Sequence, residues 1–178
     1  MKNILLTFTF FSLLTISCKK LDKKTQFDIE NTTQSTIESI IGVNLPFDIP
    51  TPTITTNIEQ EMEEHNSRKD LIEYANLKEL KLSISSPTTS DFDFLNDMEI
   101  FIRADGLSKN KIAEIHDIPE TQLKELNLNV IPDVDLQNYI KSDKYYLDIT
   151  VKTDKILLQD VTIDIYSKVF IDAKILGI

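Results

Sequence analysis

Residues 144–152 read KYYLDITVK and residues 161–175 read VTIDIYSKVFIDAKI. In both stretches aliphatic or aromatic residues alternate with polar ones: Tyr145, Leu147, Ile149 and Val151, then Val161, Ile163, Ile165, Val169, Ile171 and Ile175. A period of two is typical of β-strands that bury one face. Sheets with one buried and one wet face favour antiparallel pairing. The C-terminal third therefore predicts an antiparallel β-domain.

The second stretch is long for a single strand, because each residue of a strand advances the chain by about 3.3 Å. We therefore expect a bend near Ser167, so that this strand serves two sheets or bridges their edges.

Further strands are expected upstream, where the same alternation recurs in shorter stretches. It is clear at residues 27–30, 80–84, 98–102 and 126–130, weaker at 54–62 and ambiguous at 111–117. Residues 44–53 hold three prolines, which cannot donate to a ladder, and predict an extended edge or crossover segment. A polyproline ligand is the alternative interpretation of that stretch.

Short helices are expected to connect these strands and to plug the ends of the domain. Asn66 or Ser67 can cap residues 68–75, and Asp133 or Asp135 can cap residues 136–141. A single turn is expected from Asp91 or Asp93 through Phe94 and Leu95. Together these patterns predict a mainly β fold, an antiparallel immunoglobulin-like β-sandwich with a few short connecting helices.

The N-terminus has the pattern of an export signal. Lys2 gives the start one positive charge, residues 4–16 carry no charge and are mostly apolar, and Ser17 is a small residue before Cys18. A charged start, an apolar run of about 7–15 residues and a small residue at the cut are typical of secretory signals. The run is shorter than the roughly 20 residues that a membrane-spanning helix needs.

The sequence Leu14-Thr15-Ile16-Ser17-Cys18 resembles the lipobox of bacterial lipoproteins, although Thr15 stands where most of them have Leu. The resemblance implies cleavage before Cys18, lipidation of its thiol and attachment to the membrane by two or three acyl chains. Stable anchoring needs more than one chain, so this number suffices. An ordinary signal peptide with an incidental cysteine is the alternative.

The residues after the cysteine suggest a location. Lys19 follows Cys18 where an Asp would favour the inner membrane, so the resemblance implies the outer membrane, and the basic start of the tether favours its periplasmic face. We expect a signal peptide at residues 1–17, a lipidated tether at 18–26 and a single β-sandwich domain at 27–178.

Composition limits the functions of the exported part. Residues 1–17 hold one lysine and no acid, so their removal changes the net charge from −10 to −11. An acidic chain without a basic stripe is a poor nucleic-acid binder, and we expect no nucleic-acid partner. Cys18 is the only cysteine, so stability must come from packing rather than from disulfides.

Catalytic and metal-binding patterns are weak. His65 and His116 are far apart in sequence and are interpreted as surface or turn residues. No Ser-His-Asp or Cys-His arrangement for nucleophilic catalysis is therefore expected. The acids Asp91, Asp93, Asp97 and Glu99 fail the spacing of an EF-hand, because Leu95 and Asn96 occupy its fifth and sixth positions. A looser calcium site is the alternative to helix caps. We expect no catalytic residue, no metal and no cofactor.

Three functions remain. The first is a non-enzymatic envelope lipoprotein whose sandwich binds an envelope or extracellular ligand or has a structural role. Ser86-Pro87 and the turn at Asp93 to Leu95 resemble secreted bacterial lipoproteins, a likeness that implies no activity. The second is a periplasmic carrier of an apolar ligand, which requires a cavity. The third is an envelope glycan hydrolase, which requires two converging acids.

Overall fold

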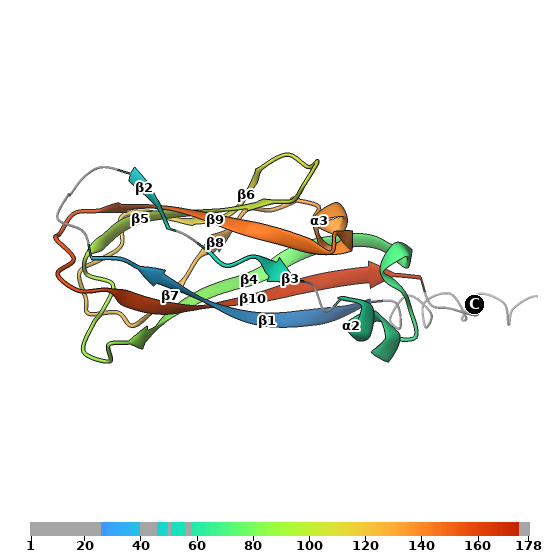
Figure 1. Ribbon diagram of the computed structural model, residues 1–178, viewed down its shortest axis with the longest axis horizontal. Coiled ribbons are helices and arrows are strands. Elements are labelled where there is room, and N and C mark those ends of the chain that lie inside the picture. Colours follow the sequence, from blue (N-terminus) through green and yellow to red (C-terminus); the bar gives the residue numbers. More distant parts are fainter. Residues whose placement is uncertain (1–25, 40–45, 50, 56–57, 175–178) are drawn as a thin grey trace, which may run out of the picture.

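Two antiparallel sheets face each other in the computed structural model, which describes residues 26–39, 46–49, 51–55 and 58–174 (Figure 1). The first sheet has the order β1 (Gln26–Ile37), β10 (Val161–Ala173), β4 (Ile72–Ser86) and β7 (Glu125–Asn127). The second has the order β2 (Pro46–Ile49), β9 (Lys144–Thr153), β5 (Leu95–Arg103), β6 (Asn110–Ile115) and β8 (Asn129–Val130), with β3 (Ile54–Thr55) also paired to β9. The expected β-sandwich is thus confirmed.

The core lies between the sheets and is built from the alternating residues of the long strands. All four apolar residues of β9 that share one parity are buried, and β10 buries Val161, Ile163, Ile165 and Ile171 in the same way. The polar residues between them face outward, because successive side chains of a strand point to opposite faces. The C-terminal alternation therefore predicted these two strands correctly.

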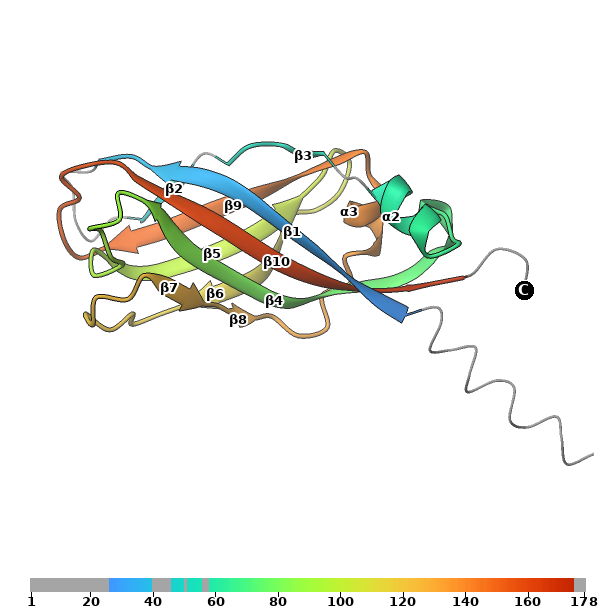
Figure 2. The same ribbon diagram turned by 90° about the horizontal axis from the view of Figure 1, so that it is seen from below.

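Helices gather at one end of the sandwich. Figures 1 and 2 show α2 (Ile58–Glu64) and α3 (Gln137–Lys141) at the end where β1 begins and β10 finishes. The 3₁₀ helix η2 (Lys69–Leu71) leads into β4. The β4–β5 and β9–β10 loops lie at the opposite end (Figure 1). Helices were expected at the ends of the sandwich, but they cover only one of them, and loops close the other.

The last strand differs from the expectation that it would bridge two sheets. β10 pairs with β1 in unbroken register from Gln26↔Asp172 to Ile37↔Val161, and with β4 on its other side. The register against β4 shifts between Lys168 and Val169, one residue beyond the expected bend. A bulge of this kind accommodates local twist without ending the ladder. Because β1 pairs along its whole length, β10 stays in one sheet.

Two upstream expectations were wrong. Ile58 and Met62, assigned to a weak strand, lie on α2 and are both buried. Residues four apart share a face of a helix and also share strand parity, so this spacing could not distinguish the two. The predicted helix at 68–75 is only η2, after which β4 begins at Ile72. Pairing of Ile72 with Ala173 and the burial of Ile72 outweigh the local helical pattern.

Other connectors agree with the sequence. The helix expected at 136–141 is present as α3, and Asp135 Oδ1 accepts hydrogen bonds from the Gln137 N–H at 2.9 Å and the Ala75 N–H at 3.4 Å. The ambiguous stretch at 111–117 is largely strand β6. β2 is the edge strand expected of the proline-rich segment and pairs with β9. No described helix is long and apolar enough to cross a membrane.

Candidate functional site

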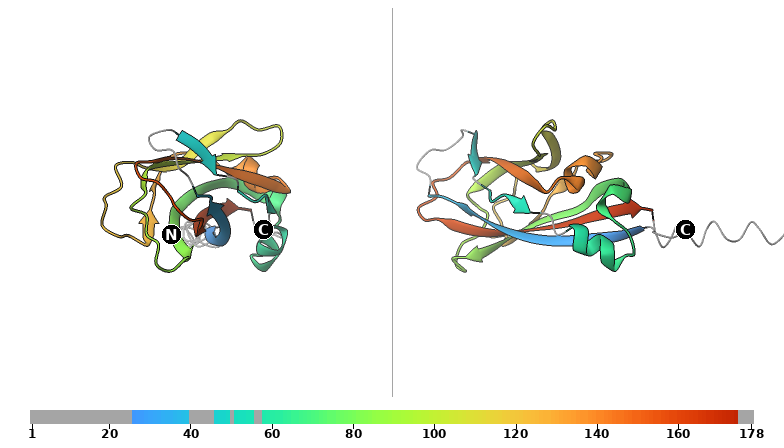
Figure 3. Two further views of the ribbon diagram at one scale, coloured as in Figure 1. Left: turned by 60° about the vertical axis from the view of Figure 1, so that its left-hand side comes forward. Right: turned by 45° about the vertical axis from the view of Figure 1, so that its right-hand side comes forward.

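A cavity of about 210 Å³ lies between the sheets, next to the edge strand β1. Its walls come from elements far apart in sequence, namely β1, β3, α2, α3, β9 and β10, and Figure 3 (right) shows how these elements gather on the β1 side. Most of the wall is aliphatic: Ile29, Ile54, Ile58, Ile140, Val169 and Ile171. The sequence placed several of these residues on buried faces but could not separate a cavity wall from ordinary core.

Tyr145 is the buried polar group of this cavity. Its side chain is on the inward row of β9, opposite Ile54 of β3, and the residue is 8% exposed. Among the described residues its hydroxyl has no hydrogen-bond partner. Burial raises the pKa of the phenol to about 12, so the hydroxyl is protonated at neutral pH. The residue as a whole is largely buried, so a ligand in the cavity could supply the hydrogen bond that no described residue gives its hydroxyl.

The mouth of the cavity is polar. Asn31 of β1 and Ser167 of β10 are paired residues on the inward rows of their strands, and both line the cavity. Asn31 is nevertheless exposed, because β1 is the edge of its sheet. Glu61 of α2, one helical turn from Ile58, adds a carboxylate. The cavity thus combines an aliphatic interior with hydrogen-bonding groups at its opening.

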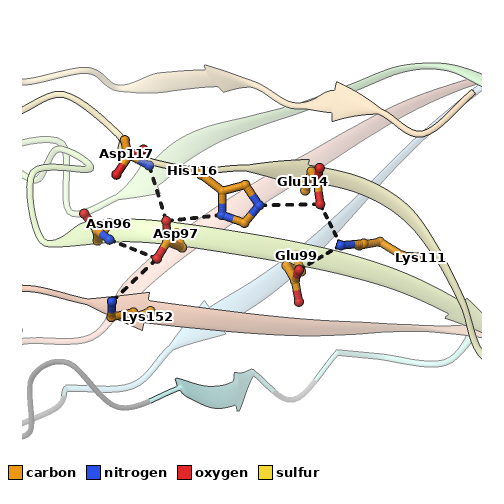
Figure 4. Close-up of polar contacts among 8 residues, drawn as sticks. All are labelled: Asn96, Asp97, Glu99, Lys111, Glu114, His116, Asp117 and Lys152. Carbon is orange, nitrogen blue, oxygen red and sulfur yellow. Dashed lines mark hydrogen bonds and ion pairs between the residues drawn. The ribbon is translucent and has the colours of Figure 1, made fainter.

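A second group of polar side chains lies on the outer face of the other sheet (Figure 4). Lys111 Nζ is 2.9 Å from Glu99 Oε1 and 2.7 Å from Glu114 Oε2. His116 Nδ1 is 3.2 Å from Asp97 Oδ1, and its Nε2 is 3.4 Å from Glu114 Oε2. We call these five residues, on or just after β5 and β6, the outer-face network.

The charges of the outer-face network stabilise one another. Burial alone would lower the pKa of His116, but hydrogen bonds and charge from Asp97 and Glu114 outweigh it and raise that pKa above its usual range. Burial alone would likewise raise the pKa of Asp97, and the hydrogen bonds donated by the Asp117 N–H, Asn96 and His116 lower it instead. The network ties β5 to β6 on a partly solvated surface.

The outer-face network is a poor candidate for a metal centre. Glu99, Glu114 and His116 do place one ligand atom each within 4.8 Å of one another. The ammonium of Lys111, however, already bonds both carboxylates, and a metal ion would have to displace it. We therefore interpret the network as a set of ion pairs that holds the sheet.

The other polar residues considered in the sequence have structural contacts. His65 stacks on Phe27, with ring centroids 3.7 Å apart. The Asp91 carboxylate accepts from the Asp93 N–H at 3.1 Å, and the Asp93 carboxylate accepts from the Gln122 N–H at 2.7 Å.

The looser calcium site considered for the four acids is not assembled in the described structure. Asp91 and Asp93 bond backbone groups, whereas Asp97 and Glu99 belong to the outer-face network. Cys18 and the rest of residues 1–25 lie outside the described residues.

A shallower hollow lies at the opposite end, between the β4–β5 and β9–β10 loops. Its rim includes Ile156 and Leu158, which are 51% and 88% exposed. Its charged groups already have partners, since Asp93 accepts from Gln122 and Lys155 pairs with Glu120. The cavity at β1 is the better candidate, because its walls are mostly aliphatic and include the largely buried Tyr145, whose hydroxyl bonds none of the described residues.

Comparisons with known proteins assign no family. No family model and no curated protein match the chain. Among solved structures, a chain of Desmodium yellow mottle tymovirus is 11% identical with a TM-score of 0.30, covering 86% of this chain and 91% of its own. A chain of turnip yellow mosaic virus is 12% identical with a TM-score of 0.27, covering 85% and 84%. Scores this low carry no argument about this protein.

Proposed function

We propose that this chain is a lipid-anchored protein of the bacterial cell envelope whose β-sandwich binds a small apolar ligand without catalysis. The observation that carries the proposal is the cavity at β1, with its aliphatic walls and a Tyr145 hydroxyl that bonds none of the described residues. Anchoring is the expectation drawn from residues 4–16 and Cys18. Of the functions considered, this combination favours the carrier of an apolar ligand.

The size of the cavity limits the ligand. Pockets for drug-sized molecules usually measure about 300–1,000 Å³, whereas this one measures about 210 Å³. An apolar cavity of about 150 Å³ is known to accommodate benzene. We therefore expect a single ring or a short alkyl group inside, with any remaining part of the ligand outside the mouth.

The position of the cavity is consistent with a ligand taken from a membrane. Ile29 is three residues from Gln26, where β1 begins, and Cys18 is eight residues before Gln26. An extended chain covers at most about 3.6 Å per residue, so those eight residues span no more than about 29 Å. Lipid on Cys18 would thus keep the cavity close to the bilayer surface.

Isoleucine methyl NMR tests ligand binding directly, because five isoleucines line the cavity. We would use residues 18–178 with Cys18→Ser, since every described element lies within them. Addition of toluene should shift the methyl signals of Ile29, Ile54, Ile58, Ile140 and Ile171.

The signals of Ile100 and Ile112, which are buried elsewhere in the core, serve as internal controls and should not move. Absence of shifts at the lining isoleucines up to the solubility of toluene would contradict the proposal. Equal shifts at all isoleucines would contradict it as well, since they would indicate a general effect of solvent.

A further inference from the structure

We infer that the cavity selects its ligand by head group: it accepts an apolar group next to a neutral hydrogen-bonding group, such as a hydroxyl, amide or ester, and disfavours a carboxylate. This inference rests on the proposed function and deepens it. Three features of the cavity support it, namely the hydroxyl of Tyr145, the polar pair at the mouth and the charge of Glu61.

The Tyr145 hydroxyl provides the first selective contact. A buried hydroxyl loses its hydrogen bonds to water and is stabilised only if another group replaces them. Here the pKa of about 12 keeps the proton on the oxygen, so the group can both donate and accept. A neutral ligand oxygen beside it would form the missing hydrogen bond, whereas a pure hydrocarbon would leave the hydroxyl unsatisfied.

The mouth provides contacts for the rest of the head group. Ser167 Oγ donates to the Asn31 backbone oxygen at 3.5 Å, the limit of hydrogen-bond length. Among the described residues the side-chain amide of Asn31 has no hydrogen-bond partner. An amide offers one acceptor and two donors. The opening can therefore bind a neutral polar group without breaking a hydrogen bond between described residues.

Glu61 accounts for the rejection of anions. Glu61 lines the cavity, and its carboxylate forms no ion pair among the described residues. The described lining residues include no Lys, Arg or His. The other lining acid, Glu30, is 3.1 Å from Lys168 and is thus paired. A ligand carboxylate would lose hydration at the mouth and meet a like charge there without a counter-ion.

Three ring compounds of similar size separate these effects. Toluene, benzyl alcohol and benzoate would be titrated into residues 18–178 carrying Cys18→Ser, with the lining isoleucine methyl signals as the readout. We expect benzoate to bind at least about tenfold more weakly than benzyl alcohol, and Glu61→Gln to recover part of that difference. Glu63→Gln, on the exposed side of α2, is the matched control and should leave benzoate binding unchanged.

Tyr145→Phe tests the hydroxyl, because it keeps the ring and removes one oxygen. The loss of one hydrogen bond should weaken benzyl alcohol about fivefold, while toluene should bind equally well or more tightly. Tyr139→Phe is the matched control: this buried tyrosine does not line the cavity, and its hydroxyl already bonds Ser108 and Asn110.

The results distinguish the inference from the proposed function. Selection by head group is wrong if Tyr145→Phe weakens the binding of toluene and of benzyl alcohol to the same extent. It is also wrong if benzoate binds the unchanged cavity as tightly as benzyl alcohol does. In both cases the shifts caused by toluene would still show that the cavity binds apolar ligands. If none of the three compounds shifts those signals, the proposed function itself fails.

Discussion

Two buried tyrosines of this sandwich differ in what their hydroxyl groups contact. Tyr139 Oη donates to the Ser108 carbonyl oxygen at 2.7 Å and accepts from Asn110 Nδ2 at 2.8 Å. Tyr145 is buried to a similar extent, at 8% exposed against 4%, yet its hydroxyl has no partner in the described part of the chain. Removal of the two hydroxyl groups should therefore have different effects on stability.

We predict that Tyr139→Phe lowers the free energy of unfolding by about 1–3 kcal/mol, because it leaves buried polar groups unpaired. Tyr145→Phe should leave that free energy unchanged or raise it, since only an unsatisfied hydroxyl is lost. Urea denaturation of both variants beside the parent chain measures the difference. A loss for Tyr145→Phe as large as that for Tyr139→Phe would show that Tyr145 has a partner in the folded chain.

For single residues, the sequence predicted whether the side chain is buried or exposed but not which groups it contacts. Alternation placed Tyr145 on the inward row of its strand, which is correct. That Tyr145 lines a cavity depends on α2, β3 and β10, and no pattern in the sequence shows that these elements come together. His116 was expected on the surface, where its side chain is 47% exposed. Its contact with Asp97 follows from the pairing of β5 with β6, which no local pattern contains.

At the scale of the element, the sequence predicted the type of secondary structure where the spacing of apolar residues fits only a strand. It did not do so where the spacing fits both a strand and a helix. The alternation of β9 and β10 has no helical equivalent, and both strands are present. Ile58 and Met62 satisfy both periods, and the helix prevails in the structure. The caps expected at Asn66 or Ser67 preceded no regular helix, because Ile72 pairs with β10 instead.

The α3 helix gives a prediction about an element. Asp135 connects the first N–H of α3 to the Ala75 N–H of β4, so it stabilises both the helix and its contact with the sheet. We predict that Asp135→Ala lowers the free energy of unfolding by about 1 kcal/mol, a usual effect of losing a side-chain hydrogen bond to backbone N–H groups.

Glu38→Ala is the control for the Asp135 variant, because that exposed carboxylate has no hydrogen bond in the described structure. It should change the free energy of unfolding by less than about 0.5 kcal/mol. Urea denaturation compares the two variants under identical conditions. Similar effects of both would mean that loss of negative charge, rather than loss of the two hydrogen bonds to Asp135, explains the change.

At the scale of the whole molecule, the two ends of the sandwich differ in a way that fits attachment at one of them. The start of β1 and helix α2 lie at one end, and the β4–β5 and β9–β10 loops lie at the other (Figure 2). The cavity is lined by residues 29–32 of β1 and by residues of α2 and α3. Attachment through Cys18 would direct the cavity toward the lipid and the loops away from it. The sequence predicted the anchor and the sandwich separately. That the cavity lies near the start of β1, and so near the anchor, follows only from the order of the strands in the sheets.

The anchor itself is tested by growth of cells with radiolabelled palmitate. Wild-type protein should take up label, Cys18→Ser should take up none, and Ser17→Ala, which keeps a small residue before the cysteine, should be labelled like wild type. Protease added to intact cells tests which face of the outer membrane carries the protein. The labelled protein should stay whole until the outer membrane is opened, because Lys19 and the basic tether favour the periplasmic face. Digestion from outside would instead place the cavity at the cell surface, where it would meet ligands from the environment. Absence of label from the wild type would remove the anchor, and with it the reason for the cavity to lie near a bilayer.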